Sequence, residues 1–232
     1  MSETVSISTL DHAGSFSAYC ARPEGEPRAA IVVIQEIFGV NAGIRRKCDR
    51  LAADGYLALA PDLFWRIDPE VELDPDVEAE FKRALQLMGR FDQDQGVADI
   101  EATIRHARNA LGVRKVGVVG YCLGGRLAYM VAARTDADAS VGYYAVGIPE
   151  LLREKHAIAR PLMLHLAGAD HFVPPEAQAA IHEGLDDHPK VTLHDYPGED
   201  HGFATEIGAR RSEEAANLAD SRTAAFFAEH LG

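Results

Sequence analysis

The sequence predicts an α/β fold with a mostly parallel central sheet flanked by helices. Short apolar segments of strand character alternate with helical segments along the chain, and several of the apolar segments are continuous. Continuous apolar strands are typical of parallel sheets covered on both faces. Strands that alternate with helices favour right-handed parallel crossovers. The polar residues of chemical interest each follow a strand, and the carboxyl ends of the strands are where such sheets place their functional groups.

The predicted strands begin with a hairpin around Gly14, formed by Val5–Ser8 and Ser15–Ala21. Its second strand alternates apolar and polar residues, which is typical of a half-buried strand. Six further strands are predicted, and they are Ala30–Gln35, Tyr56–Ala60, Lys115–Gly120, Ser140–Val146, Leu162–Leu166 and Val191–Tyr196.

Six helices are predicted between and after these strands. They are Ala42–Ala53, Val77–Met88, Gly96–Ala110, Leu123–Ala133, Pro175–Glu183 and Ser212–Glu229. Ser212 followed by Glu213 and Glu214 indicates the start of the last helix, because a serine and acidic residues are favoured at helix N-termini.

The length and composition favour one soluble domain over residues 1–232. A chain of 232 residues with 47% hydrophobic and 25% charged residues fits one large α/β domain. No apolar run is long enough to cross a bilayer. The first residues lack the basic flank and apolar core of a secretory signal. We therefore expect a cytoplasmic protein.

The formal net charge of −13 disfavours nucleic acid and anionic membranes as partners, because both require a basic face. Any recognition of a substrate carboxylate must therefore be local. The three cysteines include no CxxC pair, so a disulfide framework is not expected, and Cys20 and Cys48 are interpreted as packing residues. No two histidines have the one-turn helical spacing of a metal site. We expect no metal and no cofactor.

A candidate nucleophile lies in the segment GYCLGG, residues 120–125, which directly follows the apolar segment VGVV. It has the form of a nucleophile elbow, a sharp strand-to-helix turn, with Cys122 in place of the usual serine. The positive end of the following helix would favour a thiolate and an oxyanion there. The alternative is a buried cysteine at a tight turn, since free cysteine often behaves as a small hydrophobe.

A candidate acid and a candidate base follow two later strands. Asp170 comes after the predicted strand Leu162–Leu166, and His201 lies beside Gly202 in the loop after Val191–Tyr196. A cysteine nucleophile needs such a base, and the base needs an acceptor that orients it. The chain order of nucleophile, acid and histidine is that of the α/β-hydrolases.

The sequence offers rivals for both roles. Glu199 and Asp200 are acidic but too close to His201 along the chain to orient it from behind, and His171 directly follows the candidate acid. The remaining histidines lie in strands, helices or turns, where a packed or solvated role is expected, and they are His12, His106, His156, His165, His182, His188, His194 and His230. Only His201 combines a loop after a strand, a glycine neighbour and the correct order.

Another polar segment, QEIFGVN at residues 35–41, follows the predicted strand that begins at Ala30. It carries a carboxylate, Glu36, at the end of the strand. In the hydrolase layout this loop donates one oxyanion-hole N–H and the residue after the nucleophile donates the other. Those donors would be the backbone amides of Ile37 and Leu123. A surface acid or a helix cap is the alternative role for Glu36.

These motifs together resemble the dienelactone hydrolases (carboxymethylenebutenolidases), and the likeness covers almost the whole chain. The similar stretches are QEIFGVN at 35–41, GYLALAPDLFWR at 55–66, GYCLGG at 120–125, VGYYAVG at 141–147, AGADHFVP at 167–174 and HGFA at 201–204. The resemblance implies an α/β-hydrolase fold without a large cap domain and a triad of Cys122, Asp170 and His201. It also implies that Glu36 contacts the resting thiol and helps to generate the thiolate when substrate arrives.

The chain departs from the family pattern at two positions. Family members that act on dienelactone grip its carboxylate with two arginines, and the matching positions here are Thr205 and, by an ungapped count, Phe81. Lys82 and Arg83 are adjacent to the second position, so a small shift would bring a cation there. The departures predict unchanged chemistry with a shifted substrate class.

We therefore expect a thiol hydrolase of small-molecule esters or lactones that forms an acyl-thioester on Cys122 and is not tuned to dienelactone. The expected oligomeric state is a monomer or a small homo-oligomer. The residues expected to line the substrate pocket are Phe38, Trp65, Phe81, Tyr143 and Thr205. The alternatives are a non-catalytic ligand-binding protein of the same fold and a redox-sensing thiol protein.

Overall fold

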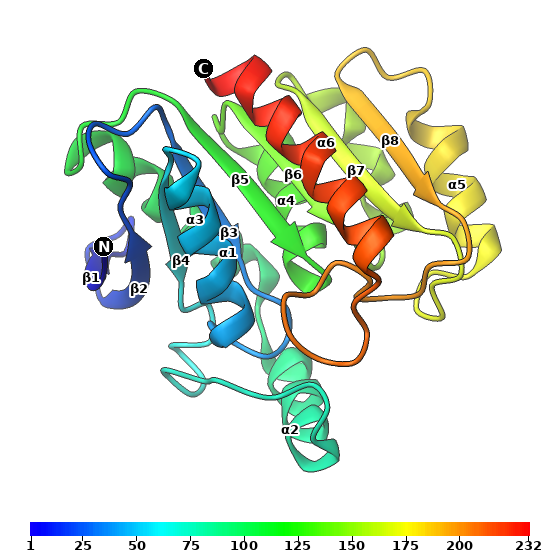
Figure 1. Cartoon of the computed structure of the whole chain (residues 1–232), viewed down its shortest axis with the longest axis horizontal. Helices are drawn as coiled ribbons and strands as arrows, with labels where there is room; N and C mark the ends of the chain where they lie inside the picture. The colour runs from blue at the N-terminus through cyan, green and yellow to red at the C-terminus, as the bar shows by residue number, and fades with distance from the viewer.

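A central sheet of eight strands organises the chain, and the computed structural model describes all 232 residues (Figure 1). The order of the strands in the sheet is β1-β2-β4-β3-β5-β6-β7-β8. β1 pairs with β2 and β2 with β4 in antiparallel fashion, and every later pair is parallel. The bounds are β1 Ser2–Ser8, β2 Ser15–Ala21, β3 Ala30–Ile34, β4 Leu57–Pro61, β5 Val116–Tyr121, β6 Ala139–Tyr143, β7 Leu162–Ala167 and β8 Val191–Tyr196. The mostly parallel sheet and the opening hairpin are as predicted.

Helices cover both faces of this sheet. Figure 1 shows α1 and α6 in front of the sheet and α3 and α4 behind it. The bounds are α1 Ala42–Ala53, α2 Glu78–Arg90, α3 Gln93–Asn109, α4 Leu123–Arg134, α5 Pro175–Leu185 and α6 Glu213–Leu231, with a 3-10 helix, η1, at Pro149–Ala157. None of the helices combines the length and the apolar composition needed to span a membrane.

The central strands are fully buried because each face packs against helices. Alternate residues of β3 divide between two apolar cores. Val32 and Ile34 pack with the core on the α3 and α4 side, whereas Ile31 and Val33 pack with the core that includes α1 and α6. Side chains of a strand alternate between its faces, so a strand covered on both sides is apolar at every position. This is the reason for the continuous apolar segments in the sequence.

The observed bounds of several strands and helices differ from the predicted bounds, and the structure explains the differences. The strand predicted to run to Val146 ends at Tyr143, because Tyr144 has a positive φ of 36° that no strand accommodates. The helix predicted from Gly96 begins at Gln93, where the Asp92 side chain accepts two backbone N–H bonds as an N-cap. Ser212 precedes α6 as predicted, but its hydroxyl donates to Glu199 instead of capping the helix. η1 was not predicted.

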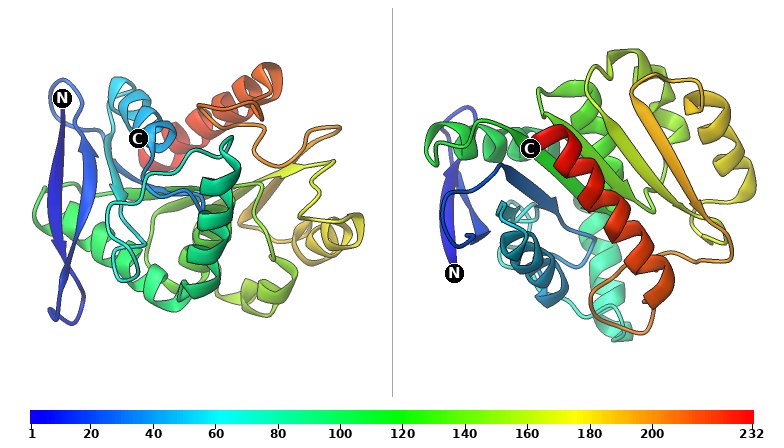
Figure 2. Two further views of the ribbon diagram at one scale, coloured as in Figure 1. Left: turned by 90° about the horizontal axis from the view of Figure 1, so that it is seen from below. Right: turned by 45° about the horizontal axis from the view of Figure 1, so that its top comes forward.

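The carboxyl ends of the parallel strands meet along one edge of the sheet, the lower edge in Figure 1. α2 extends from this edge, and the loop between β8 and α6 runs past it (Figure 2). Cys20 and Cys48 lie in the apolar cores and are completely buried, as their interpretation as packing residues predicts. The polar segments singled out in the sequence follow β3, β5, β7 and β8, so they lie at the edge where the carboxyl ends of these strands meet.

Candidate active site

Cys122 forms the turn between β5 and α4 with φ 56° and ψ −114°. A non-glycine residue with positive φ is strained, and such strain persists only where surrounding structure fixes it. Here the Cys122 N–H donates to the Tyr143 carbonyl of the neighbouring strand at 3.0 Å, and its carbonyl accepts from the Arg126 N–H at 3.2 Å. The thiol is partly exposed, in contrast to the other two cysteines. The elbow predicted from the sequence is therefore present.

The glycines of the elbow are required by close backbone approach. A Cβ atom on Gly120 would lie 1.9 Å from the Gly124 carbonyl oxygen, and one on Gly124 would lie 2.4 Å from the Ile34 carbonyl oxygen. Both distances are far inside van der Waals contact, so no side chain fits at either position. The glycines allow α4 to begin directly against the end of β3, with the positive end of its dipole at Cys122.

The imidazole of His201 and the carboxylate of Asp170 form a buried pair. His201 Nδ1 lies 2.8 Å from Asp170 Oδ2, and both side chains are almost completely buried. Asp170 Oδ1 accepts a hydrogen bond from the backbone N–H of Phe172 at 2.9 Å, which fixes the orientation of the carboxylate. His201 Nε2 is buried and has no hydrogen-bond partner. The nitrogen needed for proton transfer is thus free within the site.

The protonation of His201 is set by these neighbours. Burial is the largest influence on the pKa of His201 and lowers it, but hydrogen bonding to Asp170 and the adjacent Cys122 outweigh burial and raise that pKa to about 10. A carboxylate and a thiolate both stabilise the charged imidazolium. The arrangement therefore favours a protonated His201 beside Cys122 at neutral pH.

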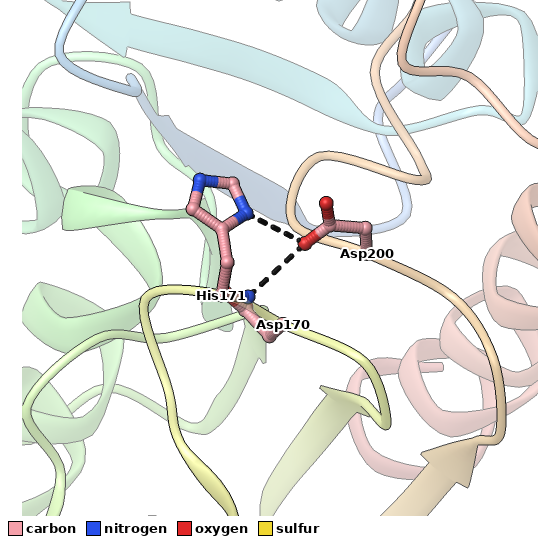
Figure 3. A group of neighbouring side chains, drawn as sticks. All are labelled: Asp170, His171 and Asp200. Atoms are coloured by element: carbon pink, nitrogen blue, oxygen red, sulfur yellow. Dashed lines mark hydrogen bonds and ion pairs between the residues drawn. The ribbon is translucent and has the colours of Figure 1, made fainter.

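His171 and Asp200, the rivals suggested by the sequence, are occupied with each other (Figure 3). His171 Nδ1 lies 2.8 Å from Asp200 Oδ1, and the His171 backbone N–H donates to the same oxygen at 3.1 Å. Ligand atoms of these two residues and Asp170 lie within 4.8 Å of one another, the spacing of a metal site. Both Asp170 oxygens, however, already accept the bonds from His201 and Phe172. The third rival, Glu199, accepts from Ser212.

Glu36 lies at the end of β3, almost completely buried, and pairs with an arginine that the sequence analysis missed. Glu36 Oε2 is 3.6 Å from Arg210 Nη2, and Glu36 Oε1 is buried without a hydrogen-bond partner. The guanidinium of Arg210 packs 5.5 Å from the ring centre of Phe38 and against Gly202, where a Cβ atom would approach it to 2.6 Å. The only signal in the sequence was a pair of basic residues, Arg210 and Arg211, in the loop that follows the histidine.

A cavity of about 410 Å³ brings many of the predicted residues together. Cys122 and His201 line it, as do Ile37, Leu123 and Arg210. The full lining is Ile37, Phe38, Phe81, Leu85, Met88, Gln93, Cys122, Leu123, Arg126, Val146, Gly147, Glu150, Phe172, His201 and Arg210. Its volume and its mostly apolar lining are typical of sites for small molecules.

The two amides predicted to bind an oxyanion remain available. The Ile37 N–H donates no hydrogen bond to another group of the chain. Leu123 is the first residue of α4, and the N–H groups of a first helical turn have no acceptor within the helix. Both residues line the cavity with Cys122, so both are placed where an oxyanion hole is expected.

Three of the five residues expected to line the pocket lie elsewhere. Trp65 stacks on Phe16 and donates its indole N–H to Asp99. Tyr143 is buried at the end of β6, and its hydroxyl shares a hydrogen bond of 2.6 Å with Thr223 of α6. β6 side chains alternate between the faces of the sheet, and this one points to the α6 face.

Thr205 is also outside the main cavity. It is buried and lines a small separate cavity beside Glu36. Phe38 and Phe81, in contrast, do line the main cavity, with ring centres 5.8 Å apart. Lys82 and Arg83 form ion pairs with Glu78 and Asp68 and do not line the cavity, so neither provides a cation there.

Comparisons with known proteins agree with this geometry. The model of the dienelactone hydrolase family matches residues 16–231. A protein of Azospirillum brasilense, provisionally named a carboxymethylenebutenolidase, is 47% identical over 220 residues, covering 94% of this chain and 95% of the relative. The carboxymethylenebutenolidase of Pseudomonas putida is 40% identical over 229 residues, with coverage of 98% and 97%.

Solved structures show the same fold. A Klebsiella pneumoniae protein provisionally named a dienelactone hydrolase superposes with a TM-score of 0.83 at 28% identity, and the match covers 99% of each chain. A dienelactone hydrolase-like promiscuous phosphotriesterase from metagenomic libraries superposes with a TM-score of 0.81 at 20% identity over 100% of this chain and 99% of that chain, a likeness of fold alone. The expected α/β-hydrolase architecture without a separate cap domain is confirmed. On the family match and the near-complete coverage of its relatives, this chain belongs to the dienelactone hydrolase family, a family of ester and lactone hydrolases.

Proposed function

We propose that the protein hydrolyses esters or lactones of small carboxylic acids through Cys122, His201 and Asp170. The observation that carries the proposal is the convergence of the thiol and the carboxylate-bound imidazole on one cavity. The names of the relatives, carboxymethylenebutenolidases, support the same reaction class. The raised pKa of His201, about 10, supports a thiolate as the resting nucleophile.

The first half of the reaction acylates the enzyme. The Cys122 thiolate attacks the carbonyl carbon of the substrate, and the electron pair of the C=O bond moves onto oxygen. The backbone N–H groups of Ile37 and Leu123 hold that oxyanion, and each such donor is typically worth about 3 kcal/mol of barrier. When the intermediate collapses, the bond to the leaving oxygen breaks and that oxygen takes a proton from His201 Nε2. The products of this half are an acyl-thioester on Cys122 and the free alcohol.

The second half releases the acid. Acylation removes the thiolate charge that raises the pKa of His201. The pKa of His201 therefore falls, and the neutral imidazole can act as the base that takes a proton from water. His201 takes a proton from water as the water oxygen attacks the thioester carbonyl. The C–S bond then breaks, the Cys122 thiolate returns, and the carboxylic acid leaves. Asp170 stabilises the imidazolium that is present in the resting enzyme and that forms again in the second half.

The charges around the cavity support a neutral substrate. Arg210 is balanced by Glu36 at 3.6 Å. Arg126 is engaged by the Gln93 side chain and by the Glu150 carboxylate. Each cation has a counter-charge nearby, although Arg210 Nε and Nη2 make no hydrogen bond, so the net charge of the site offers little attraction to a carboxylate. A neutral ester is therefore the better match than dienelactone, which carries a carboxylate.

The proposal is tested with p-nitrophenyl acetate, a neutral activated ester. Cys122→Ala and His201→Ala should each reduce kcat/KM by at least 100-fold, because each removes a group that forms or breaks bonds. His156→Ala is the control, since this exposed histidine of η1 does not line the cavity and its loss should leave the rate within twofold. Hydrolysis at wild-type rates by the Cys122→Ala variant would refute the mechanism. Ligand binding without turnover of any ester would instead support a binding protein.

A further inference from the structure

One face of α2 carries large apolar side chains that are exposed although they lie beside the site. Phe81, Leu85 and Met88 follow the spacing of a single helix face, and all three line the cavity that contains Cys122. Leu85 is 41% exposed and Met88 is 42% exposed. In α2 only Ala84 and Leu87 are buried, so the helix rests on the molecule through a narrow contact. The three side chains are here called the α2 face. Phe81 is partly buried against Phe38, whereas Leu85 and Met88 bury little of their apolar surface on folding.

Two further aromatic side chains line the cavity. Phe38 packs on Phe81, and Phe172, which is 44% exposed, stands next to His201. The polar residues at the remaining side are already engaged with one another. Arg126 Nε donates to the Gln93 side-chain oxygen at 2.8 Å, and Arg126 Nη1 lies 3.1 Å from Glu150 Oε2. An occupant of the cavity beyond Cys122 therefore meets mostly hydrocarbon surfaces. The one further cation, Arg210, is balanced by Glu36 at 3.6 Å, although its Nε and Nη2 make no hydrogen bond.

The chemistry of the site orients this occupant. The leaving oxygen must reach His201 to receive its proton, so the alcohol part of an ester lies on the His201 side. His201 has aromatic contacts with Tyr144 and Phe172 but none with the α2 face. The acyl part extends from the carbonyl carbon away from the imidazole. Phe81 of the α2 face packs on Phe38, which directly follows the oxyanion-hole residue Ile37, whereas Phe172 packs on His201. These contacts favour the α2 face as the surface next to the acyl part.

We propose that the α2 face binds the acyl chain of the substrate, and that the preferred substrates are neutral esters with an apolar acyl chain longer than acetyl. This inference rests on the proposed ester hydrolysis and adds the substrate class. Each methylene that leaves water for an apolar surface contributes about 0.8 kcal/mol, which is roughly a fourfold gain in kcat/KM. Because the α2 face is only partly covered, the expected gain from acetate to hexanoate is at least tenfold overall.

The first experiment measures kcat/KM for p-nitrophenyl acetate, butyrate, hexanoate and octanoate. The wild type should favour hexanoate over acetate at least tenfold. The double variant Leu85→Asp with Met88→Asp should bring that ratio close to one, since it places charges where the chain would lie. Both positions are exposed, so the variant is expected to fold. Leu218→Asp, an equally exposed leucine on α6 that is 47% exposed and outside the cavity, should leave the ratio unchanged.

The second experiment fixes the direction of binding with acetate esters of methanol, butanol and hexanol. Their kcat/KM values should vary less than threefold, because the alcohol part lies away from the α2 face. A strong rise with alcohol length, or an unchanged hexanoate-to-acetate ratio in the double variant, would overturn the inference while p-nitrophenyl acetate hydrolysis still upheld the proposed function. Absence of hydrolysis of every ester by the wild type would instead refute the proposed function itself.

Discussion

At the scale of single residues, the site depends on charges that are held close to their opposites inside the protein. His201 is paired with Asp170 next to Cys122, and Glu36 is paired with Arg210. Burial makes a charge costly unless it is paired. Removal of one member of a pair is therefore expected to shift the pKa of the partner that remains. The direction of the Cys122 thiol is fixed by the strained backbone of the elbow, which places the side chain in the cavity at the start of α4.

The Glu36–Arg210 pair leads to a prediction about substrate charge. In the wild type, kcat/KM for p-nitrophenyl acetate should exceed that for dienelactone, because Glu36 balances the guanidinium that would otherwise attract a carboxylate. Glu36→Gln removes the negative charge and should raise the dienelactone-to-acetate ratio at least fivefold. The ratio is the measured quantity because any general loss of thiol activation affects both substrates alike. A strong preference of the wild type for the anionic lactone would contradict this interpretation of Arg210.

At the scale of elements, the glycines of the elbow decide how closely α4 approaches β3. Gly124 has the Ile34 carbonyl oxygen where its Cβ would be, whereas Gly89, in the exposed last turn of α2, has nothing within 4 Å of that position. Gly124 and Gly89 therefore have different structural roles. One is required by a backbone contact, and the other only lowers the propensity of its helix.

The two glycines provide a matched pair of variants. Gly124→Ala should reduce the free energy of unfolding by about 1–3 kcal/mol or more, since the end of β3 must move to admit the methyl group. It should also reduce esterase activity, because the same shift displaces Ile37. Gly89→Ala should instead increase stability by up to ~1 kcal/mol, because alanine loses less entropy in a helix. Urea unfolding of the three proteins measures both effects, and equal effects of the two substitutions would disprove the assignment.

At the scale of the whole molecule, the sheet separates two polar systems. The candidate site lies at the carboxyl edge, whereas a buried network on the α6 side joins β7, β8 and α6. His165 is its centre, with Nδ1 2.7 Å from the Tyr196 hydroxyl and Nε2 2.9 Å from the Thr223 hydroxyl. This is the satisfied core histidine that the sequence offered as one interpretation. It ties the C-terminal helix to the sheet on the face opposite α4.

The network predicts a pH dependence of stability. Burial lowers the pKa of His165 well below 6.5, its ordinary value, so the folded protein holds this imidazole neutral. As pH falls below 6.5 the unfolded chain gains a proton that the folded chain does not, and stability decreases. The contribution of one such group between pH 7.5 and 5.5 is about 1 kcal/mol. His165→Gln should therefore show a smaller loss of unfolding free energy over that range than the wild type.

The matched control for this prediction is His171→Gln, an exposed histidine that pairs with Asp200 at the surface. Its stability difference between pH 7.5 and 5.5 should resemble that of the wild type. Urea denaturation at the two pH values gives both numbers. An unchanged difference in the His165→Gln variant would show that another group carries the acid sensitivity.

The amino-acid sequence by itself predicted the succession of strands and helices along the chain, the turn that holds Cys122, and the pairing of Asp170 with His201, whose catalytic roles stay a prediction. These inferences succeed because they depend on local backbone rules: apolar periodicity, the glycines of a tight turn, and the position of a residue directly after a parallel strand. The end of β6 was misjudged by the same rules, because the positive φ of Tyr144 has no signal in residue type.

Only the tertiary structure decided which side chains face the cavity. Trp65 and Tyr143 were expected there but point to other faces, whereas Arg210 reaches Glu36 from a loop five residues beyond Thr205. Leu85, Met88 and Phe172 likewise had no function in the sequence, although their neighbour Phe81 was expected in the pocket. The physical reason is that the direction of a side chain in a loop, or on a helix with a narrow contact, depends on packing between elements far apart in the chain. Local sequence patterns carry no record of that packing.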